Sequence, residues 1–168
     1  NSNDYLRCGT ALTTGTANTQ LYVFKSNSTT GYNTVFYYGN YNVYTPSYNW
    51  IGFTRSQSNF LLANYTAPTD ASLTTAANTD FRISSGYIND GGTNRLFLEG
   101  VQKSTGTSTA MSGFNSAIRP TIGIVENLIN DPMNGYIGIV GYWSTAMNAS
   151  LRRRFEQAAS FSFKIACS

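Results

Sequence analysis

Acidic residues are the first candidates for chemistry, because the chain contains no histidine. Without histidine, the sequence lacks Ser-His-Asp and Cys-His catalysis and the commonest metal ligand. Glycoside hydrolysis needs only two carboxylates, placed about 5–10 Å apart. The eight acids are scattered singly along the sequence: Asp4, Asp70, Asp80, Asp90, Glu99, Glu126, Asp131 and Glu156. The spacing therefore predicts a protein that is not an enzyme, and catalysis would require acids distant in sequence to converge in space.

Metal-ligating residues are equally sparse. Cys8 and Cys167 stand at opposite ends of the chain and cannot make a zinc site alone. Asn130 and Asp131 could offer oxygen ligands to calcium, but one acid makes a poor calcium site. The sequence Asn130-Asp131-Pro132 is also typical of a simple turn. We predict no cofactor, with calcium as the only metal for which the sequence offers ligands.

Aromatic residues are the most distinctive candidates for binding. Tyr41, Tyr44 and Tyr48 fall in a segment rich in Asn, Pro and Ser, and Trp50 follows it. Exposed Tyr and Trp rings provide flat apolar area with a polar group at low entropic cost, as surfaces that bind sugars or proteins require. We predict a ligand-binding site at these four residues. A loop that packs its own rings, or an oligomer contact, would use the same residues.

Composition limits the class of protein. The chain has 168 residues, so we expect residues 1–168 to fold as a single domain that buries roughly 70% of its unfolded surface. Only 11% of residues are charged and the net charge is +3, which gives no basic stripe for nucleic acid. We expect Arg152 to Arg154 to form a solvated helix face. No run of 18 apolar residues is present, so we expect no membrane span.

Short strands must position these residues. Between turn signals, apolar and β-branched runs of strand length recur along the chain. The predicted strands are Asp4 to Thr13, Gln20 to Ser26, Asn33 to Gly39, Trp50 to Thr54, Phe60 to Tyr65, Asp80 to Ile88, Arg95 to Val101, Pro120 to Val125 and Tyr136 to Trp143. We expect a soft connection at Ala67 to Thr79 and a polar loop at Lys103 to Ser116.

A helix and a last strand close the chain. Asn148 is a good N-cap, and Leu151, Phe155 and Ala158 or Ala159 recur at the spacing of one helix face. From Phe161 to Cys167 the apolar period switches to two, which predicts a final strand.

These motifs resemble laminin-G/concanavalin-A-like domains, in particular their bacterial and bacteriophage members. Gly135, Ile137 and Gly138 match the family's "G-x-I-G" strand, and residues 148–156 match the short helix that follows it. RLFLEGVQ and PTIGIV resemble two further strand motifs of the family. The chain departs from the family at Leu151, where members usually carry an acid. The resemblance implies an all-β, concanavalin-A-like jelly-roll sandwich of two antiparallel sheets, with one short helix near the C-terminus.

The resemblance also bears on the two cysteines. The first and last strands are neighbours in this fold, so Cys8 and Cys167 could meet and form a disulfide, which would stabilise the chain by about 4–5 kcal/mol in the chain-entropy model. The alternative is two small buried thiols that never bond.

The resemblance implies a non-catalytic module at a virion surface or in an extracellular setting, for adhesion or carbohydrate recognition. Related modules decorate phage tails, fibres or capsids, so the expected partners are cell-surface glycans, other virion or filament subunits, and further copies of the chain in an oligomer. Two alternatives remain open: a purely structural building block of a phage particle or filament, and an accessory domain of a glycan-degrading enzyme.

Overall fold

Two antiparallel sheets and one helix make up the part of the chain that the structure describes. The computed structural model describes residues 5–9, 17–28, 32–40, 49–56, 59–66, 69–76, 79–89, 93–107, 120–124 and 132–167. One sheet has the strand order β1 (Leu6–Arg7), β10 (Thr121–Ile122), β3 (Tyr32–Asn40), β4 (Asn49–Ser56), β5 (Asn59–Thr66) and β6 (Thr69–Ala76). The other has the order β11 (Gly135–Trp143), β2 (Ala17–Ser26), β7 (Phe81–Asn89), β8 (Thr93–Leu98) and β9 (Val101–Thr107).

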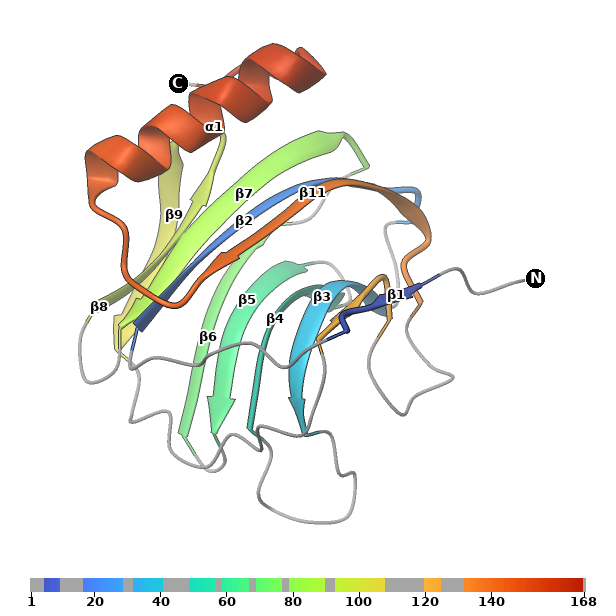
Figure 1. Cartoon of the computed structure of the whole chain (residues 1–168), viewed down its shortest axis with the longest axis vertical. Helices are drawn as coiled ribbons and strands as arrows, with labels where there is room; N and C mark the ends of the chain where they lie inside the picture. Colours follow the sequence, from blue (N-terminus) through green and yellow to red (C-terminus); the bar gives the residue numbers. More distant parts are fainter. Residues whose placement is uncertain are drawn as a thin grey trace.

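The two sheets stack face to face, and α1 (Ala149–Phe163) lies across the outer face of the five-stranded sheet (Figure 1). This arrangement confirms the predicted sandwich of two antiparallel sheets with one helix near the C-terminus.

Strand β2 is buried on both faces, which explains the uninterrupted apolar run from Leu21 to Phe24 at its centre. Alternate side chains point to opposite faces of a strand. Tyr22 and Phe24 lie in the core between the sheets, whereas Leu21 and Val23 lie in a second core beneath α1. The first core contains Tyr22, Phe24, Val35, Phe36, Tyr38, Leu96 and Leu98, and the second contains Leu21, Val23, Ile83 and Ala159.

The helix begins where the sequence predicts and ends later than predicted. Asn148 Oδ1 accepts a hydrogen bond of 2.8 Å from the Leu151 N–H, as expected of an N-cap. The helix continues to Phe163 and stops at Lys164, which adopts the left-handed conformation with φ 54°. The predicted strand from Phe161 to Cys167 is therefore wrong. Gly138 of β11 leaves room for the Phe163 ring, since a Cβ there would lie 2.5 Å from it, and this contact holds the last helical turn on the sheet.

Other predicted boundaries change for reasons of strand pairing. The predicted soft connection contains β6, whose Asp70 pairs with Tyr65 of β5, because a neighbouring strand gives even a weakly β-prone segment partners for its backbone. The polar loop predicted from Lys103 begins later, because β9 continues to Thr107. Within the described part of the predicted first strand, only Leu6–Arg7 pairs.

The two cysteines are free thiols. The Cys8 N–H donates to the Pro120 carbonyl at 2.9 Å, on the six-stranded sheet, whereas Cys167 follows α1 on the far side of the other sheet. The disulfide that the resemblance left open is not present in this structure, and a helix stands where a final strand was expected.

Candidate functional site

The predicted binding loop lies largely outside the described residues. This applies to Tyr41, Tyr44 and Tyr48, and to the side chain of Trp50. The Trp50 backbone belongs to β4, where it pairs with Gly39 of β3 and Tyr65 of β5. A site at these four residues stays a prediction.

The acids that the structure describes in detail serve ion pairs. Glu99, in the turn between β8 and β9, accepts hydrogen bonds from Arg82 Nη2 at 2.5 Å and from the Ile83 N–H at 3.0 Å. Glu156 pairs with Arg152 beneath the helix. Within the described ranges, no three residues among His, Cys, Asp and Glu gather as a metal site would require. The helix that the structure describes is not long and apolar enough to cross a bilayer.

Three titratable groups of the described chain, Tyr22, Tyr142 and Cys167, have pKa values raised by burial. Burial, followed by the neighbouring Tyr142, raises the pKa of Tyr22 well above its usual value. Burial and then Tyr38 raise the pKa of Tyr142 to about 12. Burial, followed by Glu156 and Glu99, also raises the pKa of the Cys167 thiol. A thiol with a raised pKa is a weak nucleophile, so these groups do not suit acid–base or nucleophilic catalysis at neutral pH.

Three residues on neighbouring strands form an exposed surface with the chemistry of a binding site. Tyr136 of β11 pairs directly with Lys25 of β2, which pairs directly with Phe81 of β7. The Tyr136 and Phe81 ring centroids are 6.2 Å apart, and Lys25 Nζ lies 5.6 Å from the Phe81 centroid. Tyr136 is 60% and Phe81 42% exposed. We call these three residues the aromatic platform.

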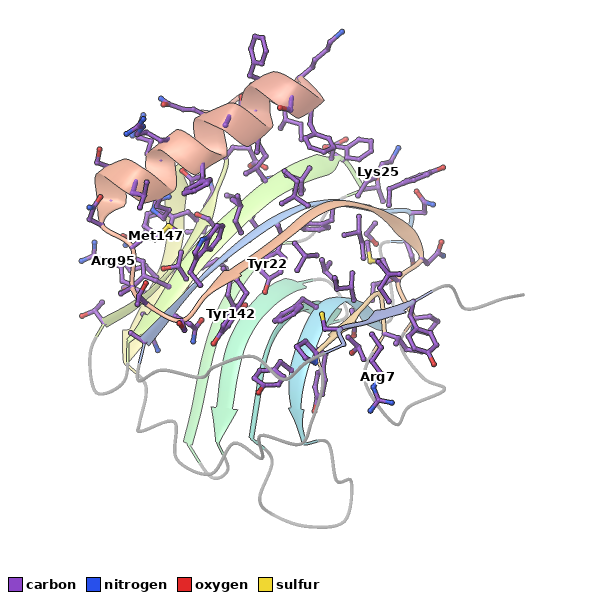
Figure 2. All side chains as sticks on the ribbon, in the orientation of Figure 1. Arg7, Tyr22, Lys25, Arg95, Tyr142 and Met147 are labelled. Atoms are coloured by element: carbon purple, nitrogen blue, oxygen red, sulfur yellow. The ribbon has the colours of Figure 1, made fainter. Side chains whose placement is uncertain are left out.

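The register of the five-stranded sheet explains why the platform faces solvent. Lys25 and Phe81 share strand parity with Val23 and Ile83, so all four lie on the sheet face that α1 covers. The helix ends short of them: Figure 2 shows Lys25 beyond the C-terminal end of α1. Phe163 packs on Gly138, two residues from Tyr136, and borders the platform on that side.

Sequence reasoning missed this site, although each residue was assigned to a strand or a strand end. A single strand gives the face of its side chains but not which residues of three separate strands stand opposite one another. The available signal was weak: an aromatic or basic residue at or next to the end of each strand.

A buried ion pair fixes the N-terminal half of α1 on the five-stranded sheet. Arg152 is only 6% exposed and Glu156 only 1%, so Arg152 does not belong to the solvated face predicted for Arg152 to Arg154. The Arg152 guanidinium lies 3.5 Å from the Phe97 ring centroid, and Arg152 Nη1 lies 3.2 Å from Ser85 Oγ. Ser85 Oγ also donates to the Glu156 carboxylate. Of the predicted apolar face, Ala159 is buried as expected, whereas Leu151 and Phe155 are partly exposed.

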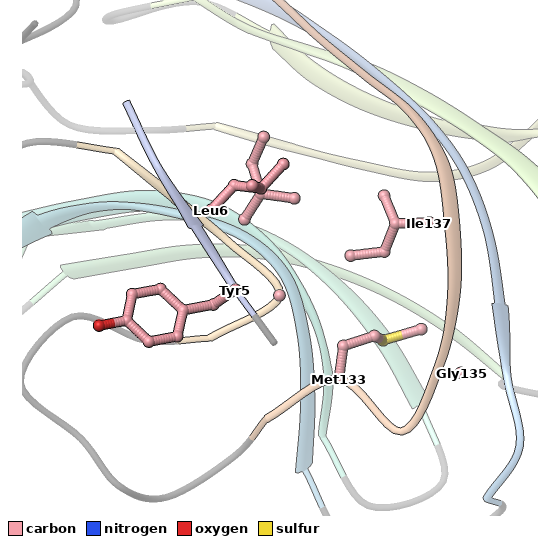
Figure 3. A pocket seen from close by; sticks show the side chains of 7 residues that line it. Tyr5, Leu6, Met133, Gly135 and Ile137 are labelled. Atoms are coloured by element: carbon pink, nitrogen blue, oxygen red, sulfur yellow. The ribbon is translucent and has the colours of Figure 1, made fainter. Parts of the chain in front are cut away.

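A cavity of about 560 Å³ opens at the edge of the sandwich, between β1, β10 and β11. Figure 3 shows Leu6 from one side, and Met133 and Ile137 from the other, pointing into the same space. Ile122, Met133 and Ile137 also pack against the core between the sheets, so the cavity floor is continuous with that core.

Comparison with known proteins identifies the fold. No protein-family model matches the chain, and no curated protein matches it significantly. Among solved structures, the CBM40 module of a Ruminococcus gnavus IT-sialidase, bound to α2,3-sialyllactose, matches with a TM-score of 0.63 and 12% identity over 80% of this chain and 79% of the module.

Two larger proteins match similarly. The NanB sialidase of Streptococcus pneumoniae (K499G mutant) gives a TM-score of 0.69 and 14% identity over 90% of this chain, which spans 26% of the sialidase chain. Botulinum neurotoxin type C, whose cell entry depends on two ganglioside molecules, gives a TM-score of 0.61 and 10% identity over 84% of this chain. This chain spans 35% of the toxin chain. At these identities the similarity establishes the fold alone. The chain is a lectin-like β-sandwich.

Proposed function

We propose that this chain is a non-catalytic module that recognises carbohydrate through the aromatic platform. The observation that carries the proposal is the direct pairing of Tyr136, Lys25 and Phe81 on an exposed face of a lectin-like sandwich. Exposed rings offer flat apolar area to the C–H face of a sugar, and the Tyr hydroxyl adds a hydrogen-bonding group. Strands hold the three side chains at fixed spacing, which reduces the ordering cost of binding.

The lysine favours an acidic sugar. The ammonium group of Lys25 lies beside the Phe81 ring, where it can pair with a ligand carboxylate while the rings contact the pyranose. The net charge of +3 also favours an anionic partner. The R. gnavus CBM40 module is bound to a sialylated sugar, which supports testing this class first.

The wider setting of the module is part of the same proposal. A virion surface or another extracellular location, with host-surface glycans as partners, rests on the resemblance of the Gly135–Gly138 motif to phage domains. The similarity to part of a sialidase chain supports the alternative of an accessory domain in a glycan-degrading enzyme. Binding of carbohydrate by the platform is common to both settings.

Glycan binding by platform variants tests the proposal. The purified chain is applied to a broad glycan array and then titrated with the best ligands and with sialyllactose by calorimetry. Tyr136→Ala and Phe81→Ala should each weaken binding about 5- to 150-fold, since the stacking of a nucleic-acid base on an aromatic side chain, the nearest measured analogue, is worth about 1–3 kcal/mol. Lys25→Gln should weaken binding of acidic sugars and leave neutral sugars unaffected.

Matched controls use the same residue types elsewhere. Phe161→Ala removes a ring that is 89% exposed on the helix, and Lys103→Gln removes an exposed lysine of β9. Both should bind as the wild type does. Unchanged binding by the platform variants would refute the site, and a loss confined to a variant with Tyr41, Tyr44, Tyr48 and Trp50 replaced by Ala would assign binding to the predicted loop instead.

The edge of β11 favours a second candidate function, a structural building block. In the part of the chain that the structure describes, β11 pairs with β2 alone, and its sequence GYIGIVGYW contains no charge. The edge strands β6 and β9 contain Asp70 and Lys103, which discourage edge-to-edge pairing. Sedimentation over a range of concentrations tests this function: reversible association that a β11 substitution such as Ile139→Lys abolishes would support it, and a monomer at all concentrations would exclude it.

A further inference from the structure

The cavity at the sandwich edge is lined mainly by aliphatic side chains. Leu6, Ile122, Met133 and Ile137 line it together with Tyr5, and among the described residues no charged side chain contributes to it. Nearby backbone groups are already bonded: the Gly123 N–H donates to Val35 O at 3.1 Å, and the Met133 N–H to Gly123 O at 2.8 Å. A sugar placed here would lose its hydrogen bonds to water without replacement, so the cavity suits an apolar group.

The strand over the cavity leaves apolar surface exposed. Strand β1 consists of two residues and pairs with β10 at only Leu6–Ile122 and Arg7–Thr121. Leu6 is 67% exposed although it borders the cavity. An apolar group of suitable size would cover this side chain and gain the corresponding burial energy. The volume of about 560 Å³ lies within the range of pockets that hold small organic ligands.

The cavity and the platform use the two faces of the same stretch of β11. Gly135 and Ile137 line the cavity, and Tyr136 between them belongs to the platform. Because successive side chains alternate across a strand, Tyr136 points outward where Ile137 points between the sheets. β11 is the edge strand of its sheet, so a single ligand can reach both faces by passing over that edge.

We propose that the cavity holds one alkyl chain, and that this chain is the aglycone of the glycan bound at the platform. The ligand class is then a glycolipid or alkyl glycoside, with its sugars on Tyr136, Lys25 and Phe81 and its chain between the sheets. The proposal rests on the proposed function for its sugar half.

A chain-length series tests it. Methyl, butyl, hexyl and octyl glycosides of sialyllactose are titrated into the 168-residue chain by calorimetry, all below their micelle concentrations, and 1-octanol is titrated as a chain without sugar. Each methylene that enters the cavity should tighten binding about fourfold. The gain should stop once the cavity is full, whereas non-specific partitioning would continue with length.

Leu6→Asp places a charge at the cavity mouth without disturbing a buried position, and it should remove the dependence on chain length while leaving the methyl glycoside unaffected. Leu151→Asp is the matched control, because Leu151 is also an exposed leucine but lies on the helix, and it should retain the full gain. Tyr136→Ala should weaken every glycoside and leave 1-octanol binding intact.

The possible failures are distinct. Affinities that do not depend on chain length, with sialyllactose still bound, would overturn the alkyl site and leave the proposed function standing. Binding of 1-octanol, abolished by Leu6→Asp, with no glycoside bound in any form, would overturn the proposed function and the assignment of the chain as an aglycone. An equal chain-length gain in wild type and Leu6→Asp would place the alkyl group elsewhere.

Discussion

Replacing Arg152 by Met tests whether the buried ion pair holds the helix on the sheet. Arg152 and Glu156 are four residues apart on α1, and both side chains face the five-stranded sheet. The guanidinium lies 3.5 Å from the Phe97 ring centroid, well inside the range of about 6 Å over which a cation–π contact is attractive. Arg152→Met keeps most of the apolar stem but leaves the Glu156 carboxylate buried without its cation.

The expected loss of unfolding free energy is large because the buried Glu156 carboxylate is left without a cation and cannot reach water. Removing one partner of a buried pair costs about 3–5 kcal/mol, of a total unfolding free energy of about 5–15 kcal/mol. Arg153, the next residue, is exposed, so Arg153→Met should change stability by no more than about 0.5 kcal/mol. The double variant Arg152→Met, Glu156→Leu removes both charges, and it should recover most of the loss because apolar replacements of buried pairs are often neutral.

Urea unfolding followed by far-ultraviolet circular dichroism measures these differences. All four proteins should share one m-value, so that shifts in midpoint report stability directly. Equal midpoints for Arg152→Met and Arg153→Met would refute the reasoning and return Arg152 to the solvated face that the sequence predicts. A double variant as unstable as the single one would show that packing, rather than an unpaired charge, accounts for the loss.

Three further predictions concern stability. The pKa of Tyr142 is raised to about 12, so the folded state keeps a proton that the unfolded state loses near pH 10. The unfolding free energy should therefore fall between about pH 10 and 12. Urea titrations at about pH 8 and 11 should show a smaller fall for Tyr142→Phe than for the wild type. Leu151→Glu should complete a capping box with Asn148 and stabilise the fold by about 0.5–1 kcal/mol in thermal unfolding, more than Leu151→Gln does, since the first turn contains no acid. Gly138→Ala should cost about 1–3 kcal/mol, because its Cβ would lie 2.5 Å from the Phe163 ring, and the double variant with Phe163→Ala should cost no more than Phe163→Ala alone.

The helix shows where sequence patterns succeed and where they stop. Its start depends on local chemistry, so Asn148 could be identified from its residue type and position. Its buried face depends on what the opposite surface offers. Arg152 contacts Ser85 and Phe97 there, and only the folded sheet places Ser85 and Phe97 side by side. Arg152 was therefore predicted to be solvated although it is buried, whereas Arg153 and Arg154 are exposed as predicted.

The strands show a similar division. Alternation in β2 and β7 was recoverable because those strands carry strong apolar residues and pair along most of their length. β6 was missed because TDASLTTA has little apolar content, and its strand conformation comes from pairing with β5. The platform was missed because it also depends on strand pairing. The register between β11, β2 and β7 is set by the whole sheet and not by any one of the three strands.

The two sheets are closed on one side of the sandwich and open on the other. Strands β6 and β9 run beside each other on the closed side, whereas the cavity between β1 and β11 lies on the open side. Fluctuations that separate the two sheets should therefore widen the side between β1 and β11 first and leave the side between β6 and β9 closed. An alkyl chain in the cavity would then enter and leave without disturbing β2, which is buried on both faces, so that ligand exchange and fold stability would depend on different parts of the molecule.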